Sequence, residues 1–171
     1  NTVIMRGYNE DEVIGLAEYA LERAIDIAFI EEMPLGEASD HAREETTCSN
    51  AWVRDTLEQR FELTDSEVKT AGPSRYVDVK GYESRIGFIS PVTHNFCGDC
   101  NRVRVTVEGR LLLCLGNEHS MDLRAILRAE DFDESRLREA IVAAMDLKPE
   151  RHYFYEKDHA QPVRLMNMTG G

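Results

Sequence analysis

Three of the four cysteines in this chain lie in one short stretch, HNFCGDCNRVRVTVEGRLLLC. Cys97, Cys100 and Cys114 have the spacing C-x2-C-x13-C. In a protein without a secretory signal, clustered thiols bind metal or do redox chemistry more often than they form disulfides. This stretch is therefore the strongest candidate for a chemically active site.

The spacing alone leaves three interpretations open. A structural zinc ion needs four protein ligands, and His94 or His119 would complete a Cys3His set. A [4Fe–4S] cluster held by three cysteines leaves one iron open to an outside ligand, which suits substrate binding. The third possibility is free thiols, or a small redox pair of Cys97 and Cys100.

Two arginines follow Cys100 at alternate positions of a sequence that is typical of a strand. Alternate side chains of a strand share a face, so we expect Cys100, Arg102 and Arg104 to point the same way. Guanidinium groups bind phosphate oxygens bidentately, and this face therefore predicts a site for a phosphate-bearing ligand. The opposite face would carry three valines that point into a core: Val103, Val105 and Val107.

The returning strand at 111–115 carries Cys114 and constrains the register of the hairpin. A three-residue loop, Glu108-Gly109-Arg110, places Cys114 opposite Arg104 and on the cysteine face. A two-residue turn would place it opposite Val103, on the other face. We predict the longer loop or a bulge, with Cys114 outside the hydrophobic core.

The composition predicts a folded, acidic protein. Twenty Lys and Arg against 32 Asp and Glu give a net charge of −12, and 42% of the residues are hydrophobic. This balance argues against a uniformly basic surface for nucleic acid. No stretch has the roughly 18 uninterrupted apolar residues of a membrane helix. Free cysteines without a signal peptide indicate a reducing compartment, so we expect a cytoplasmic protein.

The beginning of the chain has the pattern of a βαβ unit. Residues 2–5 predict a strand, Asn9 the N-cap of a helix over 11–24, and the apolar run 25–30 a buried strand. The two strands should be parallel, with a right-handed crossover. One such unit cannot bury both faces of its sheet. We therefore expect the end of a larger α/β sheet or barrel, in a chain that begins part-way through a longer protein.

After a domain boundary near Gly36, the pattern changes to that of an α+β domain. Its predicted elements are a helix from Ser49 or Asn50 to Phe61, strands at 76–79 and 85–89 joined by a turn at Lys80-Gly81, the cysteine hairpin, and helices at 121–128 and 134–147. Cys48 lies outside the cysteine motif, and we interpret it as a bystander thiol.

The longer stretch GFISPVTHNFCGDCNRVRVTVEGRLLLCL resembles the cluster segment of the molybdenum cofactor biosynthesis protein A family, the radical S-adenosylmethionine GTP cyclases. The resemblance extends through RGYNEDE, FIEEMP and the terminal RLMNMTGG, so it covers nearly all of the chain. The cysteine spacing followed by N-R-x-R is distinctive, and a separate match at the C-terminus makes coincidence improbable. With this resemblance, the iron–sulfur interpretation becomes the preferred one.

The resemblance implies a fold and a ligand set. Residues 1–36 would be the last βαβ unit of an incomplete radical-SAM (β/α) barrel. Residues 37–171 would be an α+β domain whose antiparallel strands carry the cysteine cluster. One [4Fe–4S] cluster, of two in the intact enzyme, would be bound here, with its open iron on the purine of GTP. Its ligands would be Cys97, Cys100 and Cys114, and GTP would also contact Arg102, Val103 and Arg104.

The resemblance also implies the reaction and its partners. The family converts GTP to 3',8-cyclo-GTP, a precursor of cyclic pyranopterin monophosphate, with S-adenosylmethionine as the source of the radical. Met33 matches a contact to S-adenosylmethionine, while Gly170 and Gly171 match a double-glycine tail that reaches the radical site. A homodimer and a pathway partner, cyclic pyranopterin monophosphate synthase, are implied as well, but neither nucleic acid nor membrane.

Two departures from the family pattern affect these expectations. The C-x3-C-x2-C motif that binds the radical-generating cluster is not in this sequence, so we expect the chain alone to be inactive. Ala28 stands where the family often has an arginine that helps to hold the triphosphate. One phosphate contact is therefore in doubt.

Overall fold

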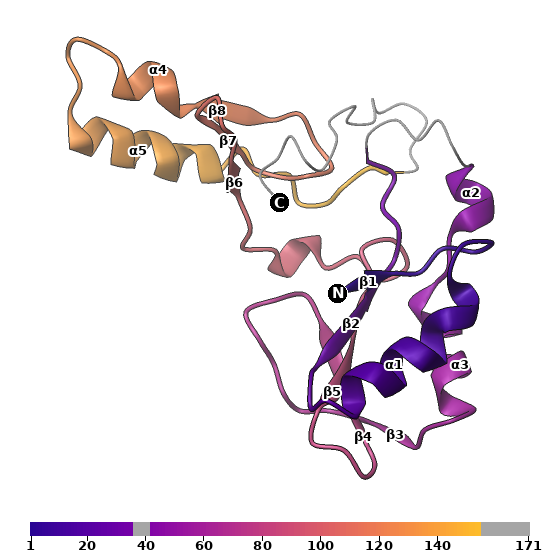
Figure 1. Cartoon of the computed structure of the whole chain (residues 1–171). Coiled ribbons are helices and arrows are strands. Elements are labelled where there is room, and N and C mark those ends of the chain that lie inside the picture. Colours follow the sequence, from indigo (N-terminus) through magenta and orange to yellow (C-terminus); the bar gives the residue numbers. More distant parts are fainter. Residues whose placement is uncertain (36–41, 155–171) are drawn as a thin grey trace. The chain divides into compact units, whose positions relative to one another are not determined.

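Strand β2 (Ile27–Ile30) is the buried strand that the apolar run predicts, and it lies inside the first sheet of the fold (Figure 1). The computed structural model describes residues 1–35 and 42–154. β2 pairs in parallel with β1 (Thr2–Val3), and helix α1 (Val13–Leu21) connects the two strands. The predicted βαβ unit is therefore confirmed, with a 3-10 turn, Glu10–Glu12, ahead of α1.

The other edge of β2 pairs with a strand far along the chain, β5 (Arg85–Ile89), again in parallel. β5 also pairs antiparallel with β4 (Arg75–Val79), and Gly81 has a φ of 88° in the predicted turn between them. A short polar strand that the sequence did not predict, β3 (Leu63–Asp65), extends the sheet beyond β4. The strand order is β1-β2-β5-β4-β3, which makes a mixed sheet.

Helices α1 and α3 (Asn50–Glu58) lie side by side on one face of this sheet (Figure 1). Ser49 caps α3 as predicted, because its Oγ accepts a hydrogen bond from the backbone N–H of Trp52. The segment before it contains one unpredicted helical turn, α2 (Arg43–Thr46). The helices and strands bury a common core, whose fully buried members include Ile4, Val13, Phe29, Val53, Leu57, Val77 and Ile86.

Asn9 occupies the predicted N-cap position, ahead of the 3-10 turn, but its side chain makes no capping hydrogen bond there. Its Oδ1 instead accepts a hydrogen bond from the backbone N–H of Met5 at 2.8 Å, and its Nδ2 donates to the carbonyl of Val3 at 3.0 Å. An asparagine amide both donates and accepts. Asn9 therefore satisfies backbone groups at the end of β1 rather than at the start of α1.

The second sheet is antiparallel, with the order β6-β7-β8, and comprises β6 (Arg104–Val105), β7 (Arg110–Leu112) and β8 (Ser120–Asp122). Helices α4 (Leu123–Leu127) and α5 (Glu134–Met145) follow it, close to their predicted positions. β8 was not predicted as a strand. The core between this sheet and its helices contains Leu111, Leu113, Leu123 and Ala144, with Met121 and Leu137 packed against them.

The hairpin of β6 and β7 has the predicted loop length, but the loop lies one residue earlier. Arg104 pairs with Leu112, so the three loop residues are those at 107–109. Gly109 closes the loop with a φ of 82°, in the left-handed region that glycine adopts at little cost. The predicted three-residue loop is therefore confirmed in length and corrected in position.

Cys114 keeps its predicted face despite this correction. The observed register, continued past the strands, places Cys114 opposite Arg102 rather than Arg104. Arg102 and Arg104 are two residues apart and share a face, so the side of the hairpin is unchanged. Leu113 is fully buried and Cys114 only half-buried, which agrees with a cysteine outside the hydrophobic core.

The three valines of this segment are exposed, so the prediction that they point into a core is wrong. Val105 lies opposite the core residue Leu111, but it is 57% exposed. The physical reason is that, within the described residues, β6 is the edge strand of its sheet and pairs with β7 alone. Val107 lies in the loop and is 96% exposed, while Val103 precedes the strand.

The compact units of the structure do not follow the boundary expected near Gly36. Of the described residues, the first unit contains 1–33 and 42–96, and the second contains 34–35 and 97–154. The pairing of β2 with β5 accounts for this division. A buried strand needs hydrogen-bond partners on both of its edges, and β5 supplies the second edge.

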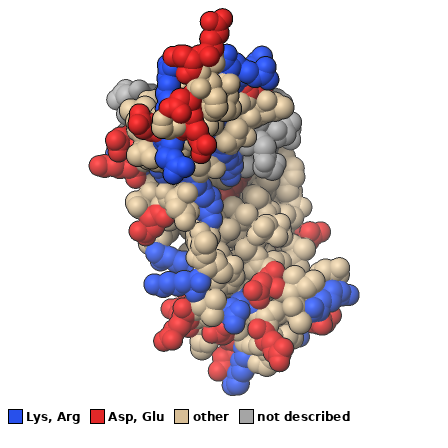
Figure 2. All heavy atoms as spheres, turned by 90° about the vertical axis from the view of Figure 1, so that its left-hand side faces the viewer, with Lys and Arg blue, Asp and Glu red and all other residues tan. Residues whose placement is uncertain are grey.

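The surface carries charges of both signs. Figure 2 shows acidic and basic side chains interspersed over one face of the molecule. Among the helices that the structure describes, none combines the length and the apolar character needed to cross a membrane.

Candidate functional site

The three cysteines of the motif lie in the second compact unit, and none of them forms a disulfide within the described residues. Cys97 opens a 3-10 turn, and the backbone N–H of Cys100 donates a hydrogen bond to the carbonyl of Cys97 at 3.1 Å. Cys114 follows β7 on the returning arm of the hairpin. Each of the three residues is half-buried, so the thiols are sheltered but still open to a ligand.

The three thiols are close enough to influence one another. Burial raises the pKa of the Cys97 thiol, and neighbouring Cys114 and Cys100 raise it further because like charges disfavour another thiolate. Two groups act in the opposite direction. The backbone N–H of His152 donates a hydrogen bond to Cys97, and the Lys148 ammonium attracts its thiolate. The fold thus brings the three predicted ligands into one neighbourhood, together with a cation.

The chemistry of the three donors suits an iron–sulfur cluster, because thiolates are soft ligands with affinity for iron and sulfide. A single zinc ion would require sulfurs about 3.8 Å apart, from Zn–S bonds of about 2.3 Å. Within residues 1–35 and 42–154, no three Cys, His, Asp or Glu side chains form a group that could hold a metal ion. His94 and His119, the candidate fourth ligands of zinc, are both exposed.

Arg102 and Arg104 are both half-buried, whereas Val103 and Val105 are exposed. This alternation is typical of an extended segment with two distinct faces. The two guanidinium groups therefore share the more covered face, which is also the face of Cys114 in the continued register. Such an arrangement can present two cations to one phosphate-bearing ligand.

Lys148 and His152 contact the cysteine region, although the sequence did not predict either. The Nζ of Lys148 donates hydrogen bonds to the carbonyl of Arg102 at 2.8 Å and to that of Leu113 at 2.6 Å. These partners are 46 and 35 residues away along the chain, so no local pattern signals the contact. From the sequence, a lysine just after α5 looks like an ordinary cation at a helix C-terminus.

The remaining predicted site residues are not brought to the cysteines by any described contact. Met33 is half-buried, belongs to the first unit and follows β2, and Ala28 is buried within that strand. Gly170 and Gly171 lie outside the described residues. Cys48 is 2% exposed in the core of the first unit, where it packs as an apolar group. Its position fits the interpretation as a bystander.

A buried carboxylate at the end of β2 is a further feature that the sequence did not predict. Glu31 is 1% exposed and accepts hydrogen bonds from the backbone N–H groups of Asn50, Val92 and Thr93 at 3.0, 3.2 and 2.9 Å, respectively. The Nδ2 of Asn50 in turn donates to the carbonyl of Ile89 at 2.9 Å. A buried charge is stable only with such partners. Glu31 therefore joins the ends of β2 and β5 to the start of α3.

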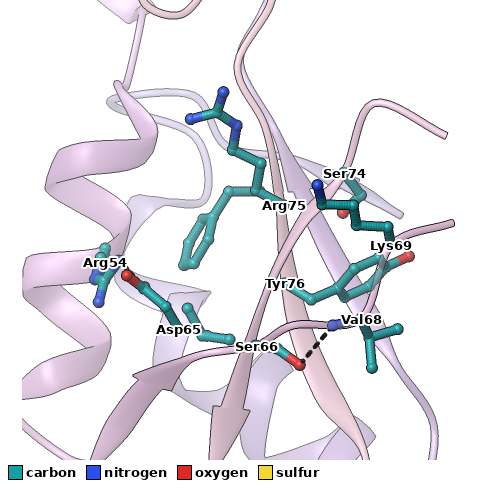
Figure 3. Close-up of a pocket in the computed structure, with 10 residues that line it drawn as sticks. Arg54, Asp65, Ser66, Val68, Lys69, Ser74, Arg75 and Tyr76 are labelled. Carbon is teal, nitrogen blue, oxygen red and sulfur yellow. Dashed lines mark hydrogen bonds and ion pairs between the residues drawn. The ribbon is translucent and has the colours of Figure 1, made fainter.

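A cavity of about 550 Å³ lies beside β4 in the first unit (Figure 3). Its lining includes Arg54, Lys69 and Arg75, but Arg54 is engaged by Asp65 and Glu58, each at 2.9 Å. Among the predicted site residues that the structure describes, none lines this cavity. Its charge is mixed, and we do not assign it to the predicted nucleotide site.

Comparison with known proteins agrees with the family resemblance that the sequence suggested. The family described as Molybdenum Cofactor Synthesis C matches residues 25–154. The GTP 3',8-cyclase of Ectopseudomonas mendocina and GTP 3',8-cyclase 2 of Pseudomonas aeruginosa are 55% and 54% identical to this chain over 171 residues. Each alignment covers 100% of this chain and 52% of the relative, so the chain spans about half the length of the relatives it matches.

The GTP 3',8-cyclase of Saccharophagus degradans gives the same result, with 55% identity over 100% of the chain. The resemblance seen in the sequence is thereby confirmed at the level of the family. The chain belongs to the Molybdenum Cofactor Synthesis C family.

Proposed function

We propose that this chain is the GTP-binding, cluster-bearing C-terminal part of a GTP 3',8-cyclase. The observation that carries the proposal is the identity of 55% over the whole chain to a protein of that name. The intact protein would be a lyase that converts GTP to 3',8-cyclo-GTP in molybdenum cofactor biosynthesis, with S-adenosylmethionine as radical source. This chain would supply the substrate site.

In this proposal, Cys97, Cys100 and Cys114 hold a [4Fe–4S] cluster. When bound, the cluster would offer one iron without a protein ligand as a binding position for the purine. The mutual proximity of the three thiols and the hydrogen bond from the N–H of His152 to Cys97 support this assignment. Hydrogen bonds of this kind orient metal ligands and tune the metal that they hold.

Arg102 and Arg104 would bind and orient the triphosphate of GTP, next to the backbone at Val103. Their half-buried position strengthens an ion pair with phosphate, because less water screens the charges than at an open surface. Ala28 cannot supply the phosphate contact that the family often makes there with an arginine. The two remaining guanidiniums would therefore carry more of the substrate affinity.

Other parts of the proposal follow from the family. Residues 1–36 would be the last βαβ unit of a radical-SAM barrel and 37–171 the iron–sulfur and GTP-binding domain. Met33 would contact S-adenosylmethionine, while Gly170 and Gly171 would reach the radical site. The intact protein would be a cytoplasmic homodimer whose product passes to cyclic pyranopterin monophosphate synthase.

Anaerobic reconstitution of the chain with iron and sulfide tests the central claim. We expect about four irons and four sulfides per chain, with this uptake lost in Cys97→Ala. Cys48→Ala is the matched control, since it removes a thiol from the core of the first unit and should leave the uptake unchanged. GTP should then change the electron paramagnetic resonance spectrum of the reduced cluster.

Two results would contradict the proposal in different ways. One equivalent of zinc that survives the addition of iron would favour a Cys3His binding module instead. A complete cluster whose spectrum does not respond to GTP would leave the metal assignment intact and remove the substrate site.

A further inference from the structure

Lys148 bridges the two arms of the cysteine hairpin beyond the point where their strands pair. The last paired residues toward the cysteines are Arg104 and Leu112. One residue past Leu112, the carbonyl of Leu113 accepts a hydrogen bond from the Lys148 ammonium at 2.6 Å, and the carbonyl of Arg102 accepts another at 2.8 Å. The ammonium thus replaces the missing strand pairing with a single cross-link.

The position of this cross-link is adjacent to the cysteines on both arms. Arg102 lies two residues after Cys100, and Leu113 immediately precedes Cys114. A change in the distance between the carbonyls of Arg102 and Leu113 would therefore also change the distance between the thiols of Cys100 and Cys114. Three ligands can hold one inorganic centre only if the segments that carry them keep a fixed separation.

The Lys148 ammonium is placed by a fixed part of the fold. The backbone N–H of Lys148 donates to the carbonyl of Met145 at 3.1 Å, which continues α5 by one turn. Near the end of α5, Ala144 is fully buried in the core beneath β7. The packing of α5 on the sheet therefore sets where the lysine side chain begins.

The chain that follows α5 makes a second contact with the cysteine site. The backbone N–H of His152 donates to Cys97, and the His152 ring stacks on Phe154 with 4.0 Å between ring centroids. Gly116 lies beneath this pair, and a Cβ there would be 2.7 Å from a ring carbon of Phe154. The segment at 148–154 is thus packed against both arms of the hairpin.

Lys148 also brings a positive charge to a group of thiolates. A cluster with three thiolate ligands becomes more negative when it is reduced, and a nearby cation stabilises the reduced form. An ammonium has three N–H donors, and the two carbonyls use two of them. The side chain can therefore hold the backbone and act on the centre at the same time.

We propose that Lys148 is a positioning residue of the cysteine site, which fixes the separation of the two cysteine-bearing arms and raises the reduction potential of the bound cluster. This inference rests on the proposed function, because it requires a cluster at Cys97, Cys100 and Cys114.

Lys148→Met and Lys148→Arg in the reconstituted chain test the inference. We expect Lys148→Met to release iron to a chelator roughly tenfold faster than the unsubstituted chain, the usual loss for a residue that orients metal ligands. The midpoint potential of the cluster in Lys148→Met should also be lower. Lys148→Arg keeps the charge and should restore the potential, with partial recovery of iron retention. Lys80→Met is the matched control, because Lys80 is an exposed lysine of the first unit paired with Glu62 at 2.6 Å.

The outcomes separate this inference from the proposed function. Suppose that the unsubstituted chain binds a full cluster, and that Lys148→Met has the same rate of iron release and the same midpoint potential. The inference is then overturned and the proposed function stands. A lower unfolding temperature of the metal-free variant, with release and potential unchanged, also overturns it. If the unsubstituted chain takes up no iron, both the inference about Lys148 and the proposed function are wrong. Should Lys148→Met fail to fold, the neutral donor in Lys148→Gln gives the same comparison.

Discussion

The carboxylate of Glu31 accepts a hydrogen bond from the backbone N–H of Asn50, the first residue of α3, at 3.0 Å. A negative charge at this place complements the positive end of the helix dipole. Backbone N–H groups of Val92 and Thr93 complete the set of donors from the segment that follows β5. One side chain therefore fixes three parts of the first unit to one another.

Glu31→Gln should lower the free energy of unfolding by about 3 kcal/mol, because the amide NH2 would face N–H donors that then lose their acceptor. Urea unfolding followed by the fluorescence of Trp52, the only tryptophan, measures this change beside α3. Glu62→Gln is the control, since Glu62 is an exposed residue that pairs with Lys80 on the surface. Equal effects of the two substitutions would contradict the role of Glu31.

Gly109→Ala should destabilise the chain more than Gly81→Ala. Both glycines have positive φ, 82° and 88° respectively, so each alanine variant should lose about 1 kcal/mol of backbone energy. A Cβ at Gly109 would also lie 2.9 Å from the Cβ of Arg124, whereas a Cβ at Gly81 would meet no described atom within 4 Å beyond its chain neighbours. The added strain at Gly109 should cost about another 1–2 kcal/mol.

Circular dichroism during thermal unfolding measures the difference between the two alanine variants. If they have the same unfolding temperature, the hairpin loop tolerates a side chain at Gly109 and the close approach to Arg124 has no cost.

Cys48 should make the stability of the protein depend on pH in the alkaline range. Burial raises the pKa of its thiol above the ordinary value of 9.0. The unfolded chain therefore loses this proton at lower pH than the folded chain. The stability that comes from Cys48 is fully present below about pH 9 and is lost as the pH rises through the folded pKa.

Urea unfolding of the metal-free chain at about pH 8 and about pH 10.5 tests this dependence. The stability difference between the unsubstituted chain and Cys48→Ala should shrink at the higher pH. Ionisation of the other three thiols is common to both proteins and cancels in the comparison. A difference that is constant with pH would mean that the Cys48 thiol ionises equally in both states.

Arg102→Gln and Arg104→Gln should each weaken GTP binding to the reconstituted chain about tenfold or more, because each loses hydrogen bonds to charged phosphate oxygens. Arg110→Gln is the control from the same hairpin, since Arg110 is exposed and bonded to Ser120 at 2.8 Å. Anaerobic titration of the cluster spectrum with GTP gives the affinities. A loss of the same size in Arg110→Gln would indicate a general effect of charge rather than a phosphate site.

The sequence predicted those parts of the fold that depend on local patterns. The apolar run of β2, the Ser49 cap and the glycine turn at Gly81 follow from residues within a few positions of one another. The pairing of β2 with β5 does not, because it joins residues such as Ile27 and Ile86 that are far apart along the chain. The three-residue strand β3 also lacks the length for a clear period.

For the candidate site, too, the sequence predicted only what depends on local patterns. Cysteine spacing and arginine alternation are local, and they assigned Cys114, Arg102 and Arg104 to one face of the hairpin. Strand alternation also assigned Val105 to the side of Leu111, but burial depends on what covers that side, and β6 is an edge. Lys148 was missed because its hydrogen bonds exist only once α5 has packed on the sheet.

The position of β6 at the edge of its sheet affects which substitutions the protein can tolerate. The segment R-V-R-V-T-V at 102–107 combines exposed valines with two arginines, and charge on an edge strand discourages pairing with a second copy. Loss of both guanidiniums would leave a short, uncharged, β-branched segment of the kind that seeds intermolecular sheets. Besides their proposed role in binding phosphate, we therefore expect Arg102 and Arg104 to disfavour self-association of the protein through β6.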